Sequence, residues 1–375
     1  MTGFYHVEGV NIAHVGYGRM AVEMSRELES LVTLTEDADA VVFMVVPHMV
    51  KGWFEGQRTA VFTMWETSVL PDHFRRYSPL FDTLIVPCDW NRELFSPFHK
   101  NIHVVPLGID HSLWKPQKVE ANSKFRFMTG GSGWLRKGID QVIKAFRDAD
   151  IPDSELVVKC PPDIYDDPFH GGTPQDLGPD ITFVRQALRP EEERDLHATA
   201  DCFVSGSRGE GFGLIPLQQA ALGNLVIAPA HTGHLMFSHM FDYALSSSPE
   251  PANMLNHKDC GDWLVPNHDE MVDAMRDAVK RGRPNLTERR ARHKKTLDFS
   301  WANSAMKLLE AHPAGGLLDG KVWRDAGKLP VKVRALRSFD AQVGTHRVRL
   351  YEGQEAEVPT STLDHLVECR AVREI

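Results

Sequence analysis

Short apolar runs alternate with amphipathic stretches along the first part of the chain, and this alternation predicts an α/β fold. Buried strands are expected in the first third at 40–46, 59–64, 83–86 and 102–106. Helices are expected between them at 21–31 and 91–95. Strands and helices in alternation are typical of parallel sheets, because the crossover helices cover both faces of the sheet.

The alternation restarts after 114–122, a polar segment with a proline that predicts a linker between two domains. Further strands are expected at 125–129, 156–159, 181–184, 202–204 and 225–228. Further helices are expected at 139–149, 215–222 and 270–281. We therefore expect two doubly wound, Rossmann-like sheets, each with a ligand crevice at the carboxyl ends of its strands.

The pattern changes after residue 300. An amphipathic stretch at 302–311 predicts one more helix, which stops at Pro313 and the glycines behind it. The alternation at 331–337, 346–351 and 354–358 is then typical of short strands. The predicted division of the chain is 1–118 and 119–300 for the two domains, 301–313 for the helix, 314–330 for a linker and 331–375 for a small β module.

Composition narrows the class of protein. Hydrophobic residues make up 42 % and charged residues 25 % of 375 residues, as in an ordinary globular protein. No run approaches the roughly 18 apolar residues that span a bilayer. The first residues do not resemble a signal peptide, so a cytoplasmic location is expected. The net charge of −9 argues against non-specific binding to a polyanion. The five cysteines lack metal-ligand spacing and are expected to be reduced thiols.

A glycine-rich turn lies at 209–213, between an expected strand and an expected helix. Backbone N–H groups in such a turn can approach an anion, and the positive end of the helix dipole stabilises it. Glu210 is placed at the mouth of this turn, where it can accept hydrogen bonds from sugar hydroxyls. Gln218 follows eight residues later, about two helical turns deeper on the same face. The alternative interpretation is a structural turn with a capping glutamate.

A second glycine-rich loop, at 130–138, contains Arg136 and Lys137 directly before an expected helix. An arginine can bind a diphosphate through its bidentate fork, and a lysine binds it as a point charge. Cations are unfavourable at the N-terminal end of a helix dipole. The pair therefore indicates an anionic ligand rather than a solvated surface.

Together the two segments resemble the donor site of glycosyltransferase family 4, whose members are retaining enzymes with the two-domain GT-B fold. The family signature is a glutamate that contacts the transferred sugar, followed eight residues later by a glutamate that holds the ribose. Glu210 matches the first, and Gln218 replaces the second; glutamine can hydrogen-bond a ribose diol, but without charge. Arg136 and Lys137 match the family's donor-phosphate loop. The resemblance implies donor contacts from Ser132, Gly133, Gly211, Phe212, Gly213, Leu214 and Gln218.

Two segments of the first domain resemble the rest of the family's cleft. Gly16, Gly18 and Arg19 match the glycine loop that closes over donor and acceptor. Trp65 and Glu66 stand where many members carry a histidine, and they resemble a subset with glutamate-threonine there. The resemblance implies that Glu66 orients or deprotonates an acceptor hydroxyl and that Trp65 stacks on a sugar. A helix-cap region is the alternative.

The expected catalytic residues are thus Glu210, Lys137, Arg136 and Glu66. The sequence at 299–301 resembles the point where the family's last helix returns to the first domain. His231 and His234 have a spacing that ligates metals on helices, but Gly233 favours a loop that contacts the donor phosphate or sugar. No aspartate-x-aspartate motif follows a strand, and Asp166–Asp167 lies in a proline-containing stretch. No essential metal or cofactor is therefore expected.

The resemblance implies transfer of a sugar, with retention, from a nucleotide-diphosphate donor to a hydroxyl acceptor. The C-terminal module resembles accessory β modules of phage-encoded proteins, which indicates a protein acceptor on a virion or host more than a nucleic acid. A module that only completes the fold is equally compatible with the pattern. A glycosyltransferase that modifies DNA bases and a non-enzymatic nucleotide-binding protein are the alternatives. A phosphorylase of similar architecture lacks support, because no cofactor-lysine motif is evident.

Overall fold

A computed structural model describes most of the chain. The described residues are 3–9, 16–120, 122–161, 177–252, 259–318, 320, 322–326, 330–335, 339–343, 346–350, 354–361, 363, 366 and 372–374. The Asp166–Asp167 pair lies outside them.

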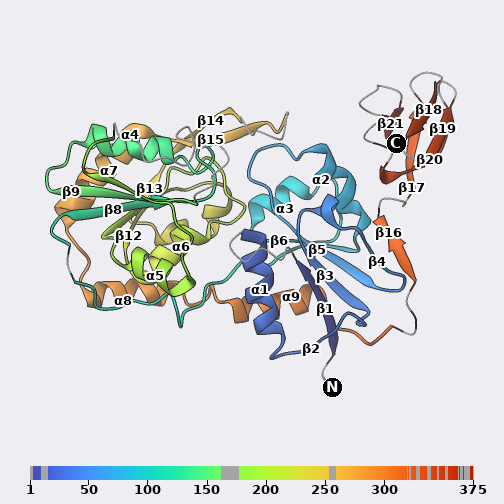
Figure 1. Cartoon of the computed structure of the whole chain (residues 1–375), viewed down its shortest axis with the longest axis horizontal. Coiled ribbons are helices and arrows are strands. Elements are labelled where there is room, and N and C mark those ends of the chain that lie inside the picture. The colour runs from blue at the N-terminus through green and yellow to red at the C-terminus, as the bar shows by residue number, and fades with distance from the viewer. Residues whose placement is uncertain are drawn as a thin grey trace.

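The N-terminal domain contains a six-stranded parallel sheet with the strand order β2-β1-β3-β5-β6-β7 (Figure 1). Its strands are β1 (Phe4–Gly9), β2 (Thr33–Leu34), β3 (Ala40–Met44), β5 (Arg58–Phe62), β6 (Thr83–Val86) and β7 (Ile102–Val104). Its helices are α1 (Gly16–Leu28), α2 (Asp72–Tyr77) and α3 (Asp89–Phe95). Every residue of β3 and β6 is buried, which explains their uninterrupted apolar sequence.

The second domain contains another six-stranded parallel sheet, with the order β10-β9-β8-β11-β12-β13. Its strands are β8 (Phe125–Gly130), β9 (Ser154–Lys159), β10 (Ile181–Val184), β11 (Cys202–Val204), β12 (Leu225–Pro229) and β13 (Tyr243–Leu245). Its helices are α4 (Ile139–Ala149), α5 (Pro190–Ala198), α6 (Leu214–Leu222), α7 (His268–Arg281) and α8 (Leu286–Lys295). Between β13 and α7, the strands β14 (Ser247–Pro251) and β15 (Asp262–Pro266) form an antiparallel β-ribbon.

The chain therefore forms the two doubly wound α/β domains that the sequence predicts, and this prediction is confirmed. In the second sheet, the strand order reverses between β8 and β11. Ligands of such sheets bind in the crevice at this reversal, outside the carboxyl ends of the two strands. The loops that follow β8 and β11 are the two glycine-rich segments at 130–138 and 209–213.

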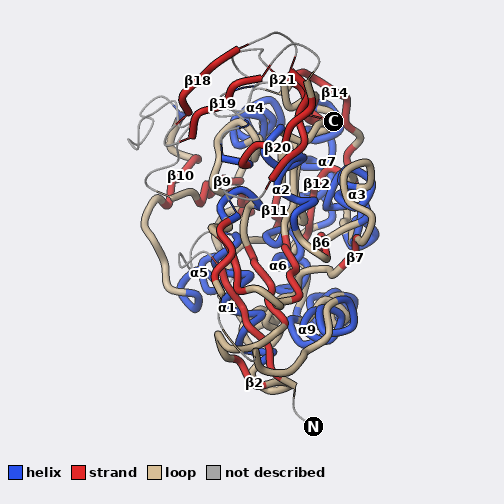
Figure 2. The backbone as a smooth tube through the Cα atoms, turned by 90° about the vertical axis from the view of Figure 1, so that its right-hand side faces the viewer, coloured by secondary structure: helices blue, strands red, loops and turns tan. Residues whose placement is uncertain are grey.

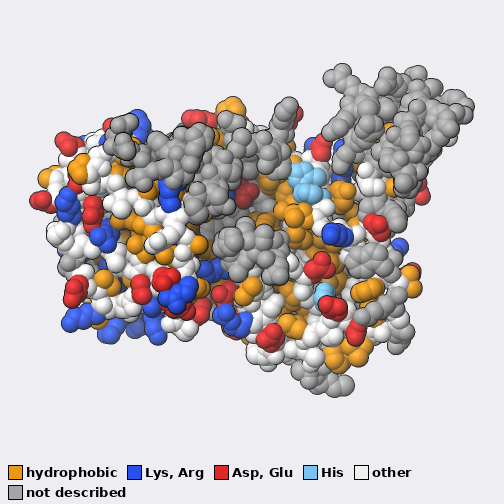
Figure 3. Space-filling model, in the orientation of Figure 1, with side chains coloured by type: hydrophobic (Ala, Val, Ile, Leu, Met, Phe, Trp, Pro, Cys, Tyr) orange, Lys and Arg blue, Asp and Glu red, His pale blue; other side chains and the backbone are white. Residues whose placement is uncertain are grey.

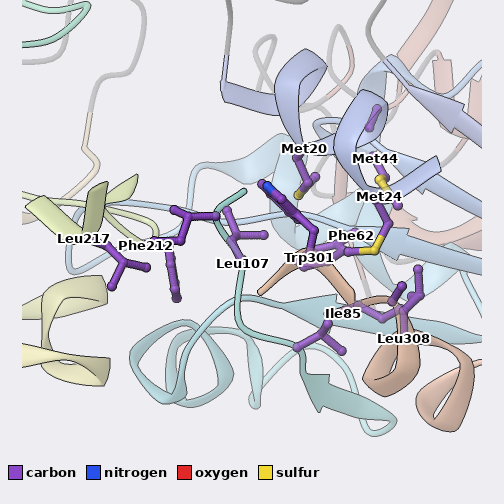
Figure 4. Close-up of a cluster of buried hydrophobic side chains, with 14 of the residues drawn as sticks. Met20, Met24, Met44, Phe62, Ile85, Leu107, Phe212, Leu217, Trp301 and Leu308 are labelled. Carbon is purple, nitrogen blue, oxygen red and sulfur yellow. The ribbon is translucent and has the colours of Figure 1, made fainter. Parts of the chain in front are cut away.

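The last long helix, α9 (Trp301–Ala311), packs against α1 of the N-terminal domain. The Ser304 hydroxyl donates a hydrogen bond to the Pro106 carbonyl at 2.6 Å. A single cluster of buried hydrophobic side chains extends from this helix into both domains (Figure 4). Its members include Met20, Met24, Phe62, Ile85, Leu107, Phe212, Leu217, Trp301 and Leu308. The two domains thus share one apolar cluster.

Part of the segment predicted as a linker at 314–330 contacts the N-terminal domain. Gly315 pairs with Phe4, and β16 (Trp323–Asp325) pairs antiparallel with β4 (Gly52–Phe54). A Cβ atom at Gly315 would lie 1.7 Å from an Asp39 carboxylate oxygen. A side chain at this position would have to displace the Asp39 carboxylate and the Arg58 guanidinium.

The described residues of the C-terminal module form two small antiparallel sheets. One is formed by β17 (Pro330–Ala335), β20 (Glu355–Pro359) and β21 (Val372–Glu374), and the other by β18 (Phe339–Val343) and β19 (His346–Leu350). Figure 1 shows the module on the side of the N-terminal domain that faces away from the second domain, and Figure 2 shows it from that side. The module therefore lies away from the crevice of the second domain.

Lys and Arg side chains gather over α8 of the second domain, at the lower left of Figure 3. The basic residues of α8 are Arg289, Arg290, Arg292, His293, Lys294 and Lys295. This surface contrasts with the net negative charge of the chain. Within the part of the chain that is described, none of the helices has the length and apolar character needed to cross a membrane.

Candidate active site

The two glycine-rich loops of the second domain are held together at the strand reversal. The Arg208 N–H donates to the Arg136 carbonyl at 2.7 Å, and the Arg208 guanidinium binds Asp140 in a bidentate manner at 2.7 and 2.9 Å. Gly138, with φ of 62°, packs so closely that a Cβ atom there would lie 1.8 Å from the Gly206 carbonyl oxygen. The loops thus form one rigid wall.

The four residues expected to be catalytic lie together at this wall. Lys137 Nζ is 2.6 and 2.8 Å from the two carboxylate oxygens of Glu210. Arg136 Nη1 donates to the Gly209 carbonyl at 2.9 Å, and it lies 3.6 Å from Glu210 and 3.8 Å from Glu66. Glu66 comes from the N-terminal domain, so the cluster joins both domains.

Burial sets the charge states in this cluster. The exposed fractions of the side chains are 8 % for Glu210, 14 % for Lys137, 15 % for Arg136 and 21 % for Glu66. Burial alone would raise the pKa of Glu210, but Lys137 and Arg136 outweigh it and lower that pKa to about 2. Burial lowers the pKa of Lys137 and raises the pKa of Glu66. Glu210 is therefore an anion at neutral pH that holds two cations in position.

The glycines of the 209–213 turn are required by what packs against them. A Cβ atom at Gly209 would lie 2.2 Å from the Glu66 carbonyl oxygen, and one at Gly211 would lie 2.5 Å from Met64. Gly213 has φ of 103°, a left-handed conformation, and caps α6. Gly209 and Gly211 thus allow the N-terminal domain to pack directly against the turn that carries Glu210.

Asn91 links the two domains at this point, and sequence reasoning missed its role. Its side chain is completely buried. Its Oδ1 accepts from the Trp65 N–H at 2.6 Å, and its Nδ2 donates to the Gly211 carbonyl at 3.1 Å. The only sequence signal is an amide near the start of a predicted helix. Asn91 fixes the segment before Glu66 relative to the turn of Glu210.

The Asn91→Asp substitution should separate these two contacts. The carboxylate still accepts from the Trp65 N–H, but it cannot donate to the Gly211 carbonyl and repels it. Because misplaced reacting groups slow catalysis strongly, we expect turnover to fall roughly tenfold or more. Steady-state kinetics beside thermal unfolding measure this. Unchanged turnover in the folded variant would contradict the role of Asn91 as a link between the domains.

Two of the aromatic side chains singled out from the sequence belong to the core. Trp65 is 4 % exposed, and its indole N–H donates to the Thr67 hydroxyl at 2.7 Å. Its ring packs on Phe74 with centroids 5.0 Å apart. It therefore fills the N-terminal core and is not placed to stack on an acceptor sugar. Phe212 is 1 % exposed and contacts Phe237 in the shared apolar cluster.

The remaining donor-side candidates are distributed over both domains. Gly16, Gly18 and Arg19 lie at the start of α1, and Arg19 Nη1 is 3.6 Å from Glu193 of α5 in the other domain. The structure places the others as follows: Ser132 exposed and Gly133 buried in the loop after β8, Leu214 half-buried at the start of α6, and Gln218, 8 % exposed, within α6.

Tyr17 was not singled out from the sequence. Its hydroxyl is 3.0 Å from the Thr63 hydroxyl and accepts from the Met64 N–H at 3.1 Å. These contacts fix the start of α1 against the chain that leads from β5 to Glu66. An aromatic residue between two glycines is the only signal that points to this position.

The turn that follows β12 hydrogen-bonds the backbone of Glu210. Thr232 has φ of 47°, and its hydroxyl accepts from the Glu210 N–H at 3.1 Å. The Gly233 N–H donates back to the Glu210 carbonyl at 3.0 Å. His231 and His234 flank this turn, both buried, with ring centroids 6.2 Å apart. Among the residues that are described, no three His, Cys, Asp or Glu side chains are grouped so as to hold a metal ion.

Known proteins resemble this chain in structure but not in sequence. No protein-family model matches the sequence, and no curated protein does. HepE of Anabaena, solved with UDP and glucose, is 9 % identical, with a TM-score of 0.60 over 83 % of this chain and 99 % of that one. A glycosyltransferase from Rickettsia africae is 11 % identical, with a TM-score of 0.59 over 82 % and 97 %. Sucrose-phosphate synthase from Thermosynechococcus elongatus is 16 % identical, with a TM-score of 0.51 over 72 % of each chain.

At these identities the likeness establishes the fold. The chain has the GT-B glycosyltransferase fold, with two parallel Rossmann-like sheets. The charged cluster of Glu210, Lys137, Arg136 and Glu66 lies where the two domains of this fold meet.

Proposed function

We propose that this protein is a retaining glycosyltransferase that moves a sugar from a nucleotide-diphosphate donor to a hydroxyl acceptor. The observation that carries the proposal is the ion cluster of Lys137, Arg136 and Glu210 at the strand reversal, with Glu66 opposite. The matched structure with UDP and glucose supports the donor class.

Lys137 and Arg136 bind the donor diphosphate in this mechanism. The bond between the anomeric carbon and the phosphate oxygen breaks while positive charge spreads over the sugar ring. Negative charge then grows on the departing diphosphate, and cations that are already in position stabilise it without reorganisation. Arg136 and Lys137 are such cations, because the Gly209 carbonyl and the Glu210 carboxylate hold them before the donor arrives.

Glu210 binds the sugar and does not attack it. Both of its oxygens contact Lys137, and its pKa is held at about 2, which makes it a weak nucleophile and a weak base. As an acceptor-only group, it suits the hydroxyl hydrogens of a sugar. Gln218 lies further along the chain, within α6. Its uncharged amide hydrogen-bonds the ribose.

Glu66 receives the acceptor on the opposite side of the cluster. Burial raises its pKa above that of an ordinary carboxyl group, which strengthens it as a hydrogen-bond acceptor for an incoming hydroxyl. The acceptor oxygen forms the new bond to the anomeric carbon on the face that the diphosphate leaves. Bond formation on this face keeps the anomeric configuration, and the hydroxyl proton passes to the departing phosphate oxygen.

The acceptor is proposed to be a macromolecule. The C-terminal module is joined to the N-terminal domain, which carries Glu66, and a second contact with a protein acceptor would raise its effective concentration there. The basic surface over α8 is the observation that favours the alternative, a nucleic acid acceptor. That surface lies on the second domain, whereas Glu66 and the attached module lie on the side of the N-terminal domain. The protein acceptor is therefore the better supported of the two.

A thermal-shift screen across nucleotide sugars tests this proposal. A ligand bound only by the native state adds about 2.7 kcal/mol at a hundred times its Kd, so at least one nucleotide sugar should raise Tm. A saturating chelator should leave both that shift and sugar transfer unchanged, because two cationic side chains neutralise the diphosphate. No shift with any nucleotide sugar would contradict the proposed donor. Activity lost to the chelator and restored by magnesium would contradict the metal-independent mechanism.

A further inference from the structure

His234 is a buried histidine whose second ring nitrogen lacks a partner. The side chain is 0 % exposed, and its ring packs against Phe237 and Phe241 with centroids 5.9 and 5.7 Å away. Its Nδ1 lies 3.0 Å from the Pro229 carbonyl oxygen. Its Nε2 is buried and has no hydrogen-bond partner among the described residues. A buried polar atom of this kind costs free energy unless a hydrogen-bond partner satisfies it.

The partner of Nδ1 determines which tautomer is present. A carbonyl oxygen can only accept a hydrogen bond, so Nδ1 must carry the proton. Burial lowers the pKa of His234, and the ring is therefore neutral at pH 7. A neutral ring that is protonated on Nδ1 presents a lone pair on Nε2. His234 Nε2 is consequently a hydrogen-bond acceptor with no hydrogen-bond donor among the described residues.

This acceptor lies beside the turn of Glu210. A Cβ atom at Gly213 would lie 2.4 Å from His234 Cδ2 and 2.6 Å from Nε2, so this edge of the ring faces the end of the 209–213 turn. The charge of Glu210 acts on His234 and partly offsets the effect of burial on its pKa. Two acceptor-only groups, Glu210 and His234 Nε2, therefore flank one short glycine turn.

We infer that His234 Nε2 accepts a hydrogen bond from a hydroxyl group of the transferred sugar, and that it selects donors with a hydroxyl at that position. This inference rests on the proposed function. The alternative partner, the donor diphosphate, has no proton to offer at neutral pH, whereas every sugar hydroxyl has one. A site that is built to hydrogen-bond a hydroxyl rejects the analogue that lacks it, because a buried acceptor is then left without a partner.

Two substitutions separate the two ring nitrogens. His234→Asn keeps an N–H near the position of Nδ1, which can still donate to the Pro229 carbonyl, but it removes the acceptor at Nε2. His234→Gln reaches the position of Nε2 and offers its amide oxygen as an acceptor there. The experiment measures kcat/KM of the native protein and both variants with the preferred nucleotide sugar and with its analogues deoxygenated at one position each.

With the native protein, one deoxy analogue should lose about two- to tenfold in kcat/KM, the range of a single neutral hydrogen bond. In His234→Asn, the complete donor should lose a similar factor and that analogue should lose nothing further, because the same bond is already absent. His234→Gln should restore the discrimination. The Kd of the nucleoside diphosphate alone should be unchanged in both variants.

The results separate this inference from the function on which it rests. If the native protein turns over no nucleotide sugar, the proposed function fails. If it does, two results would show that the inference about His234 is wrong. One is that no deoxy analogue loses kcat/KM with the native protein. The other is that, for every analogue, the loss in His234→Asn equals the product of the loss from the substitution and the loss from the analogue. If His234→Asn does not fold, the native series still contradicts the inference when no deoxy analogue loses activity. A weakened Kd for the nucleoside diphosphate would assign His234 to the phosphate instead.

Discussion

Replacing Lys137 by alanine, or Glu210 by glutamine, is expected to lower the turnover of sugar transfer at least about tenfold, or about 1.4 kcal/mol of transition-state stabilisation. Lys137→Ala removes a cation from the diphosphate site and leaves the buried Glu210 with Arg136 at 3.6 Å as its nearest cation. Glu210→Gln keeps the shape of the side chain but removes the charge that holds Lys137 in place. Steady-state kinetics of both variants measure the effect.

The loss must be separated from damage to the fold, because breaking a buried ion pair is destabilising in itself. Arg292 offers a matched control in the same domain. It binds Asp242 at 2.6 Å, and the two side chains are 15 % and 6 % exposed, close to the values for Lys137 and Glu210. Arg292→Ala should reduce thermal stability and leave turnover nearly unchanged. Near-normal turnover in folded Lys137→Ala and Glu210→Gln would overturn the assignment.

Gly209→Ala is expected to have a comparable or larger effect. Its Cβ atom would lie 2.2 Å from the backbone oxygen of Glu66, so the N-terminal domain could not pack as it does against the turn. Displacing Glu66 and Arg136 by even about 1 Å can reduce turnover roughly a hundredfold. The expected signature is a large fall in kcat together with a lower Tm, because the Cβ atom meets the backbone of Glu66 rather than a flexible side chain.

Gly320→Ala is the matched control for this substitution, since a Cβ atom there meets no described atom within 4 Å. It should leave both kcat and Tm at native values. If Gly209→Ala behaves in the same way, the close contact between the domains at Glu66 is not the state in which the reaction occurs. Small-angle scattering of the variant, with and without a nucleotide sugar, would then show whether the domains still approach each other.

The strands that are buried on both faces could be predicted from the sequence, because their apolar runs are uninterrupted. The runs at β6 and β11, and the amphipathic period of α4, give the observed bounds. Elements without such runs were missed. In β1, the sequence FYHVEG buries only Tyr5 fully, and α8 buries no residue at all. Where packing or surface charge maintains an element, periodicity carries little signal.

The site shows a similar division. Lys137 and Glu210 could be named because each lies in a glycine-rich loop after a strand, and the strand order of the sheet brings the two loops together. Asn91 could not be named, since its importance depends on a contact with Gly211 across the domain boundary. Trp65 was assigned to the acceptor because a sequence does not show which way an aromatic side chain faces. In the structure, the Trp65 side chain packs in the core of the N-terminal domain.

The most direct test of the account is the turnover of nucleotide sugars by the purified protein, followed through release of the nucleoside diphosphate and the anomeric configuration of the first product. The account predicts that at least one nucleotide sugar is cleaved, that the configuration is retained, and that cleavage falls at least about tenfold in Lys137→Ala. An inverted product, or equal cleavage by the native and Lys137→Ala proteins, would contradict it.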